Sequence, residues 1–166
     1  MRPDLLDELY HTYYEQAYAY AFSLCKSREE AEDIVADAFV KALLSCEKAP
    51  GDFLYWLLVV CRNLWIDRQR RGARLQAIQE EIAARAGEDR SPEARAIWDE
   101  RSCILMHCIL SLPTQYREVL SLHYYAGIPA TKIAQILHLS YANVKTTLHR
   151  GREKLKKELE ENGYAL

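Results

Sequence analysis

The sequence predicts an all-α protein made of two small helical bundles joined by a polar linker, and the second bundle contains a helix-turn-helix. Three observations support this. Apolar residues recur at helical spacing along most of the chain, no stretch alternates with the period of a strand, and a polar stretch around Gly87 and Pro92 interrupts the pattern. We expect the first bundle at residues 1–74, the linker at 75–92 and the second bundle at 93–166.

The composition is that of a soluble globular chain. Its 166 residues are 49% hydrophobic and 28% charged, which leaves room for one domain or two small ones. The formal net charge of -2 excludes a uniformly basic coat. We find no signal peptide and no apolar run long enough for a membrane helix, so we expect a cytoplasmic protein without membrane insertion. The 5 cysteines are scattered and form no CxxC motif, which indicates reduced thiols.

The first two predicted helices form the start of the N-terminal bundle. Residues 4–24 carry many tyrosines along an apolar face, and most of these should be buried or half-buried. Ser27 precedes Glu30 at capping-box spacing and should begin the second helix. The side of this helix opposite its apolar stripe should be exposed: Glu32, Asp33, Ala36, Asp37, Val40 and Lys41. Pro50 and Gly51 end the unit in a short loop at 45–52.

The third predicted helix, residues 53–74, changes character along its length. Its first half is apolar nearly all round and should lie centrally among its neighbours. Its second half is basic, with Arg62, Arg68, Arg70, Arg71 and Arg74 opposed by the single acid Asp67. Such a group can be a solvated helix end. It can also be a platform for backbone phosphates, which the aromatic residues just upstream favour.

After the mostly acidic linker, we expect a helix to start at Ser91-Pro92, with the proline at its first position. Cys103, His107 and Cys108 share a neighbourhood on this helix, but they lack a fourth ligand at a recognisable spacing, so packing is favoured over a metal site. No metal or other cofactor is therefore expected. Thr114 should cap the next helix, residues 116–125.

The stretch from Ala130 to Glu158 predicts two helices with a sharp corner between them. Ile133 and Val144 belong to apolar faces on either side of a break at His138-Leu139-Ser140. Ser140 is a good N-cap, and His138 should take the left-handed conformation at the bend. In a helix-turn-helix the second helix enters the major groove. The residues off its apolar stripe are Tyr141, Ala142, Asn143, Lys145, Thr146, His149, Arg150 and Arg152.

The second helix of this motif is basic in a chain that is acidic overall. A basic helix end can be no more than a solvated C-terminus that suits the helix dipole. Charge of one sign gathered on one element is also the electrostatic footprint of DNA binding, and we favour that interpretation.

Four segments in register resemble the extracytoplasmic-function (ECF) family of bacterial RNA polymerase sigma factors. They are Ala31-Glu32-Asp33-Ile34-Val35; Trp56-Leu57 followed by Arg62-Asn63-Leu64, Asp67 and Arg70-Arg71; Leu112-Pro113 with Arg117-Glu118-Val119; and Ile133-Ala134 through Asn143-Val144-Lys145-Thr146 to Leu148-His149-Arg150. The resemblance spans nearly the whole chain in the family's order.

This resemblance implies three binding surfaces. The surface for the clamp coiled coil of core RNA polymerase would be Asp33, Ala36, Asp37 and Val40. The minus-ten element would be contacted by Arg62, Asn63, Arg70 and Arg71. The minus-thirty-five element would be read by Tyr141, Asn143, Lys145, Thr146, His149, Arg150 and Arg152. The chain departs from the family at Ala36, where glutamine is usual, in its short 45–52 loop, and at Gly151, where alanine is usual.

The implied function is that of an alternative sigma factor, whose partners are core RNA polymerase, promoter DNA and an anti-sigma protein. Two other classes stay open: a free-standing helix-turn-helix regulator, and a sigma-like decoy that only binds an anti-sigma protein. An enzyme is not expected, because no acid pair, nucleophile-base pair or phosphate loop stands at usable spacing.

Overall fold

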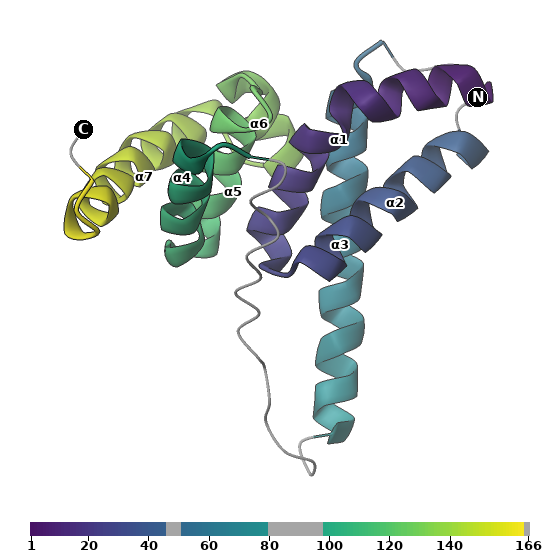
Figure 1. Cartoon of the computed structure of the whole chain (residues 1–166). Helices are drawn as coiled ribbons and strands as arrows, with labels where there is room; N and C mark the ends of the chain where they lie inside the picture. The colour runs from purple at the N-terminus through teal and green to yellow at the C-terminus, as the bar shows by residue number, and fades with distance from the viewer. Residues whose placement is uncertain (46–50, 80–97, 165–166) are drawn as a thin grey trace.

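The computed structural model describes residues 1–45, 51–79 and 98–164, and in these residues every regular element is an α-helix (Figure 1). The helices are α1 Pro3–Cys25, α2 Arg28–Ser45, α3 Phe53–Gln79, α4 Glu100–Ser111, α5 Thr114–Tyr124, α6 Ala130–Leu137 and α7 Tyr141–Glu161. The first three form an N-terminal unit and the last four a C-terminal unit, which confirms the predicted all-α fold. Residues 46–50, most of the predicted linker and the predicted helix start at Ser91-Pro92 lie outside the described residues.

Local hydrogen bonds explain where several helices begin. The Ser27 hydroxyl accepts from the Glu30 N–H at 3.3 Å, and the Ser140 hydroxyl accepts from the Asn143 N–H at 3.1 Å. Both predicted caps are therefore confirmed. The Asp99 carboxylate caps α4 by accepting from the Ser102 N–H at 2.8 Å. Each bond satisfies a donor that the first helical turn would otherwise leave unpaired.

Three predicted boundaries were wrong. The helix expected to start at Ser91-Pro92 does not run on through Trp98 and Asp99, because Asp99 is extended and caps α4, which begins at Glu100. The residue before α5 is Pro113, with φ -55° and ψ 148°, so Thr114 is the first residue of the helix and not its cap. The Thr114 hydroxyl instead accepts a hydrogen bond from the Arg117 guanidinium at 3.0 Å. Helix α3 continues past Arg74 to Gln79. The added residues include leucine, glutamine and alanine, all good helix formers, and no proline stops the helix there.

The corner of the helix-turn-helix has the predicted geometry. His138 follows α6 in the left-handed region, with φ 54° and ψ 42°, and its N–H bonds to the Ala134 carbonyl. The Leu139 N–H bonds to the same carbonyl at 2.9 Å. The chain then enters α7 at Ser140. Val144 and Leu148 hold α7 in the core, which leaves the opposite side of the helix free.

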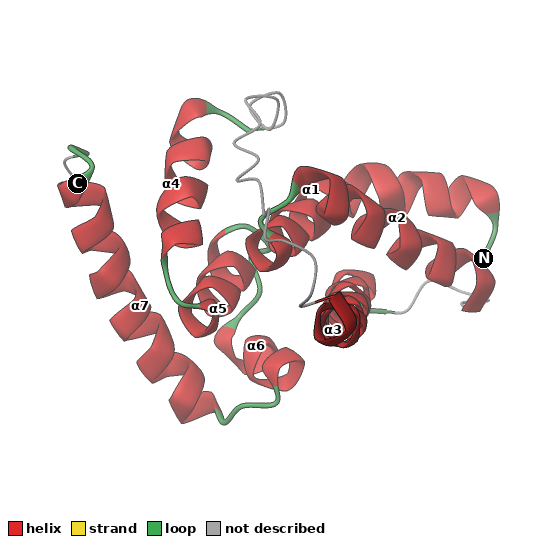
Figure 2. Ribbon diagram, turned by 90° about the horizontal axis from the view of Figure 1, so that it is seen from below, coloured by secondary structure: helices red, strands yellow, loops and turns green. Residues whose placement is uncertain are grey.

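The core has two parts, and one of them crosses between the units. One cluster fills the space between α1, α2 and α3. The other holds α4 to α7 together but also takes in Tyr20, Leu24 and Leu58 from α1 and α3. Figures 1 and 2 show the C-terminal half of α1 beside α5, and α6 beside α3. The two units are thus packed against each other over a broad contact, which the sequence pattern did not predict.

Candidate functional site

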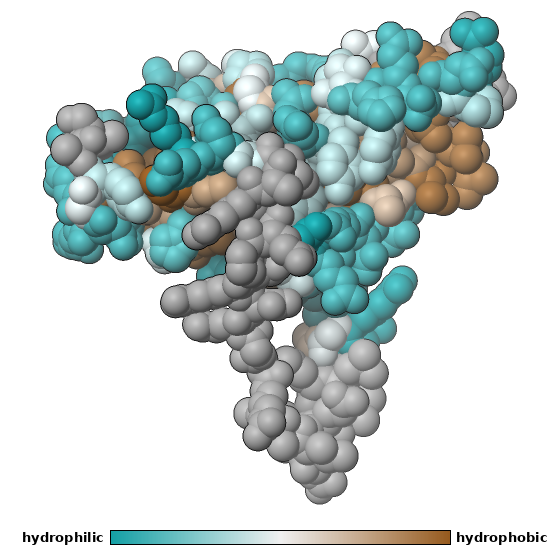
Figure 3. Space-filling view, in the orientation of Figure 1, coloured by the Kyte–Doolittle hydropathy of each residue, from teal (hydrophilic) through white to brown (hydrophobic). Residues whose placement is uncertain are grey.

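The exposed face of α2 carries the first group of predicted site residues. Asp33, Ala36, Asp37 and Val40 all lie on this face, and the Val40 side chain is 53% exposed. The Asp37 carboxylate accepts from the Arg68 guanidinium of α3 at 2.7 Å, so Asp37 has a partner within the unit. Leu44, 79% exposed, continues the apolar part of this face to the end of the helix, where Figure 3 shows hydrophobic surface. The structure therefore brings the four residues together on one open surface.

The predicted minus-ten residues lie in two different settings along α3. Arg70 and Arg71 are exposed on the basic part of the helix, and Asn63 is exposed nearer its middle. Arg62 is mostly buried: its Nε donates to Glu118 Oε1 of α5 at 3.0 Å, and the two side chains are 19% and 11% exposed. The structure does not bring Arg62 together with Arg70 and Arg71.

The predicted minus-thirty-five residues are all exposed on α7. In the first turns, Lys145 Nζ lies 5.5 Å from the centre of the Tyr141 ring, and the Thr146 hydroxyl donates to the Ala142 carbonyl at 3.0 Å. Asn143 accepts from the Thr147 hydroxyl at 3.2 Å through its side-chain oxygen, which leaves its amide NH₂ group for other partners. These side chains stand at the N-terminal end of the helix, the end that reaches base edges in a helix-turn-helix.

The later residues of α7 are partly engaged inside the protein. Arg152 Nε donates to the Tyr124 hydroxyl at 2.9 Å, and its guanidinium lies 3.2 Å from His123 Nε2. His149 lies 3.5 Å from the Glu153 carboxylate one turn on. Arg152 therefore ties α7 to α5, a contact that the sequence pattern did not suggest.

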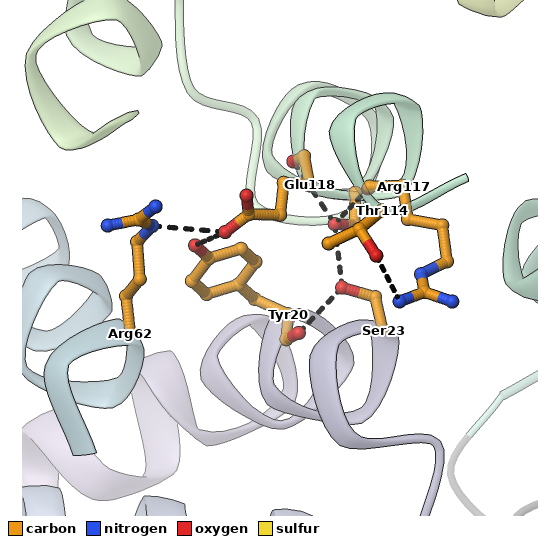
Figure 4. Close-up of polar contacts among 7 residues, drawn as sticks. Tyr20, Ser23, Arg62, Thr114, Arg117 and Glu118 are labelled. Carbon is orange, nitrogen blue, oxygen red and sulfur yellow. Dashed lines mark hydrogen bonds and ion pairs between the residues drawn. The ribbon is translucent and has the colours of Figure 1, made fainter. Parts of the chain in front are cut away.

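A group of polar contacts between the two units was missed at the sequence level. Glu118 Oε1 accepts from the Tyr20 hydroxyl at 3.3 Å as well as from Arg62, and the Ser23 and Ser121 hydroxyls lie 2.8 Å apart (Figure 4). Tyr20 and Ser23 in α1 stand three positions apart, and so do Glu118 and Ser121 in α5. All four occupy buried positions of their helices. Polar residues at this spacing on a buried face were the sequence signal for a contact between the two helices.

Lys132 of α6 makes a second link between the units. Its ammonium group is paired with the Asp52 carboxylate and lies 4.9 Å from the centre of the Tyr55 ring. The hydrogen bond from Lys132 lowers the pKa of Asp52, so this carboxylate is ionised over the physiological pH range. The helix-turn-helix is in this way joined to the start of α3.

Burial sets the protonation of Tyr20 at the junction and of two thiols in the N-terminal core. It raises the pKa of Tyr20 well above the ordinary value, and the neighbouring Glu118 carboxylate adds to the effect. The Tyr20 hydroxyl therefore keeps its proton and acts as a donor. Burial also raises the pKa of Cys61 to about 12 and that of Cys25 to about 11, so both thiols are protonated near neutral pH. Among the described residues, no group of three or more His, Cys, Asp or Glu side chains could hold a metal ion.

Comparison with protein families matches both units in order. The model described as Sigma-70 region 2 matches residues 9–75, and that described as Sigma-70, region 4 matches residues 104–155. A chain that contains both regions falls in the class of RNA polymerase sigma factors.

Comparison with individual relatives shows which family of sigma factors the chain belongs to. The ECF RNA polymerase sigma factor SigW of Bacillus subtilis is 30% identical over 94% of this chain and 89% of its own length. The RNA polymerase sigma factor YlaC of the same organism is 32% identical over 94% of this chain and 92% of its own length. The chain therefore belongs to the ECF family of RNA polymerase sigma factors. It is an alternative sigma factor that binds RNA polymerase and promoter DNA and directs transcription initiation.

Two solved structures share the fold. The sigma factor RpoE of Bartonella quintana, in complex with the anti-sigma factor NepR, gives a TM-score of 0.73 over 96% of this chain and 98% of its own, at 21% identity. CnrH in complex with the cytosolic domain of CnrY gives 0.66 over 98% and 92%, at 23% identity. Within the part of this chain that the structure describes, none of the helices combines the length and apolarity needed to cross a bilayer.

Proposed function

We propose that this sigma factor uses three separate surfaces: α2 for core RNA polymerase, the basic part of α3 for the minus-ten element, and the start of α7 for the minus-thirty-five element. The observation that carries the proposal is the Ser140-capped α7. Its buried Val144 and Leu148 anchor the helix, while Asn143 and Lys145 stand exposed in the first turns. A helix held on one side and polar on the other can lie in a major groove and read it.

Core binding is assigned to Asp33, Ala36, Asp37 and Val40. The face combines two carboxylates with an exposed apolar side chain, which suits a partner helix that carries basic and apolar residues. Alanine at position 36 offers no hydrogen bond, so contact there is apolar.

Contact with the minus-ten element is assigned to Asn63, Arg70 and Arg71, with Arg62 joining them once it leaves Glu118. Exposed arginines bind backbone phosphates by charge-assisted hydrogen bonds. Unstacking a base costs a few kcal/mol, which contacts to the exposed base and the phosphates must offset. Promoter melting then depends on the sequence of the element.

The remaining assignments follow from this role. Residues 1–74, with the continuation of α3 to Gln79, serve core and minus-ten binding; the segment from there to 92 links the units, and 93–166 serve minus-thirty-five binding. The polymerase makes the phosphodiester bonds, so the sigma factor itself is not an enzyme, and it works in the cytoplasm with the polymerase. The two solved structures that share the fold each contain a partner: RpoE is bound to the anti-sigma factor NepR, and CnrH is bound to the cytosolic domain of CnrY. An anti-sigma protein is the corresponding partner here.

The test combines transcription in vitro with a matched pair of charge reversals. The parent chain and purified core polymerase should start transcripts at defined promoters on genomic fragments. Asp33→Lys should weaken co-elution with core polymerase, because it places a cation on the proposed surface. Glu8→Lys makes the same charge change on an exposed residue of α1 and should co-elute like the parent.

Membership of the ECF family sets aside the two other classes, a free-standing regulator and a decoy. Transcription without any promoter preference would contradict the proposed DNA surfaces. Equal loss of co-elution in Asp33→Lys and Glu8→Lys would remove α2 as the specific surface.

A further inference from the structure

The junction between the two units contains a buried ion pair whose members come from opposite sides. Glu118 of the C-terminal unit receives hydrogen bonds from Arg62 and Tyr20, both of the N-terminal unit (Figure 4). A buried carboxylate is costly unless it is paired and hydrogen-bonded. Within the closed chain Glu118 has both kinds of partner, and separation of the units removes them together.

Other contacts close the same junction. The Ser23 and Ser121 hydroxyls meet at 2.8 Å with both side chains fully buried, and Gln16 Nε2 donates to the Ala126 carbonyl at 3.3 Å. Lys132 is paired with Asp52 on a third pair of elements. These polar contacts accompany the shared apolar core, in which Tyr20, Leu24 and Leu58 pack against the C-terminal unit. Opening would expose both kinds of surface to water, so the closed state is favoured in the free chain and a bound partner must stabilise the open one.

Closure brings two of the proposed DNA contacts into one small space. Arg62, assigned to the minus-ten element, and Asn143, assigned to the minus-thirty-five element, both line a pocket of about 220 Å³ together with Gln115 and Glu118. By their names the two elements lie about 25 base pairs apart, which is roughly 85 Å at about 3.4 Å per base pair, so residues that line one pocket cannot each reach their own element at the same time. The closed chain thus cannot offer these two residues to DNA together.

We propose that Glu118 is an intramolecular latch: it occupies Arg62 and holds the chain in a closed state that does not engage both promoter elements. When the units separate, Arg62 exchanges the Glu118 carboxylate for a backbone phosphate. The inference rests on the proposed DNA contacts of Arg62 and Asn143. It adds a switch between two states of the free chain, in which phosphate and carboxylate compete for one guanidinium.

The latch has a quantitative consequence. If only a fraction of the chain is open, the apparent affinity for DNA is reduced by that fraction. Weakening the latch therefore raises DNA affinity, although a buried contact has been lost. A hydrogen bond to a charged group is strong enough that its removal should shift the closing equilibrium by about tenfold or more.

The first experiment locks the junction. Because the two hydroxyl oxygens are 2.8 Å apart, cysteines at these positions lie within reach of the roughly 2 Å bond of a disulfide. The Ser23→Cys/Ser121→Cys chain should cross-link on mild oxidation. With core polymerase, on a promoter fragment selected by the parent, the oxidised chain should lose initiation and the reduced chain should regain it. The single variants Ser23→Cys and Ser121→Cys control for the native thiols and should respond to oxidant no more than the parent does.

The second experiment weakens the latch in the free and locked backgrounds. Glu118→Gln should bind a promoter duplex that carries both selected elements about tenfold more tightly than the parent, because the closed chain leaves the α7 surface exposed and prevents only contact with both elements at once. In the oxidised Ser23→Cys/Ser121→Cys background the same change should have little effect, which separates opening from the mere loss of a negative charge. Glu160→Gln, an exposed residue of α7, makes the same charge change away from the junction and should match the parent.

Three results would overturn the latch. Failure of the double variant to cross-link would show that the closed state is not populated, and full initiation by the cross-linked chain would show that closure does not block function. An equal gain from Glu118→Gln in free and locked chains would assign the effect to charge alone. Each of these overturns the latch while the reduced protein still initiates. If the parent selects no promoter at all, the proposed function fails and the latch fails with it.

Discussion

An arginine is available to bind a DNA phosphate only if its guanidinium is not already paired with a carboxylate of the protein. Arg68 is bonded to Asp37 at 2.7 Å and Arg62 to Glu118 at 3.0 Å, whereas Arg70 and Arg71 extend from the exposed part of α3. In the sequence these four residues form one basic run. The run predicted a phosphate platform but could not show which members are committed, because their partners lie 31 and 56 positions away in the chain.

Replacing Arg70 and Arg71 together with alanine should lower the salt dependence of promoter binding. Each lost phosphate contact removes about one unit from the slope of log K against log salt, so the pair should remove about two. Permanganate reactivity of minus-ten thymines should fall as well, because fewer contacts hold the melted strand. The matched control is Arg68→Ala, which breaks the pair with Asp37. It should leave the salt slope unchanged, and an equal loss of slope in both proteins would contradict the assignment.

On α7, Lys145 is free to contact a base, whereas Arg152 is already bonded within the protein, so their replacement should have different effects on DNA binding. Lysine can pair with guanine acceptors, and a good base contact discriminates by about 1–3 kcal/mol, so Lys145→Ala should flatten the preference at one base pair of the minus-thirty-five element. Arg152 bonds to Tyr124, so Arg152→Ala should weaken all sites alike and lower the stability of the α5 to α7 contact. Selection from a randomised library at fixed salt distinguishes the two. Unchanged base preferences in Lys145→Ala would remove that residue from base reading.

At the scale of the elements, local chemistry decided most boundaries, and the exceptions have local causes. Ser27, His138 and Ser140 act as their residue types predicted. In the sequence, Gly151 stood out only as a departure from the alanine that is usual in the family. In the structure a Cβ at this position would lie 3.3 Å from the Leu120 side chain, so the glycine lets α5 approach α7 closely. The apolar periodicity of α7 alone cannot show that another helix packs this closely at Gly151.

The left-handed corner between α6 and α7 gives a stability prediction. His138 has a positive φ of 54°, a conformation that costs a residue with a side chain more than it costs glycine. His138→Gly should therefore raise the free energy of unfolding, by about 0.5–1 kcal/mol once the greater freedom of glycine in the unfolded chain is included. Gln135→Gly, on the exposed side of α6, should lower it by about 1 kcal/mol. Urea titrations at an unchanged m-value measure both. A loss of stability in His138→Gly would show that the His138 side chain makes a contact worth more than the strain.

At the scale of the whole molecule, helical periodicity predicted the two units and their order but not their mutual packing. Tyr20, Ser23, Glu118 and Ser121 are polar residues at core positions, and each half of the chain looks incomplete when considered alone. Their role becomes apparent only when α1 and α5 are placed side by side. Periodicity reports which face of a helix is buried, not which other helix buries it. Each of the three proposed surfaces lies on a single helix, so the pattern of that helix could suggest it, whereas the junction is built from several helices.

The shared core allows a test of how far the two units are coupled. Leu57 and Leu58 are adjacent in α3 and fully buried, but Leu57 packs in the N-terminal cluster and Leu58 in the cluster of the C-terminal unit. Each change to alanine should cost about 2–5 kcal/mol by removing packed methyl groups and leaving a cavity. Leu57→Ala should speed amide hydrogen exchange mainly in α1 to α3, because the weakened contacts lie there. Leu58→Ala should also speed exchange in α5 and α6, and it should raise the radius of gyration above the roughly 15 Å expected for a compact chain of this length. The same exchange pattern in both variants would mean that the units unfold as one body, and no effect of Leu58→Ala on α5 and α6 would mean that the shared core does not couple them.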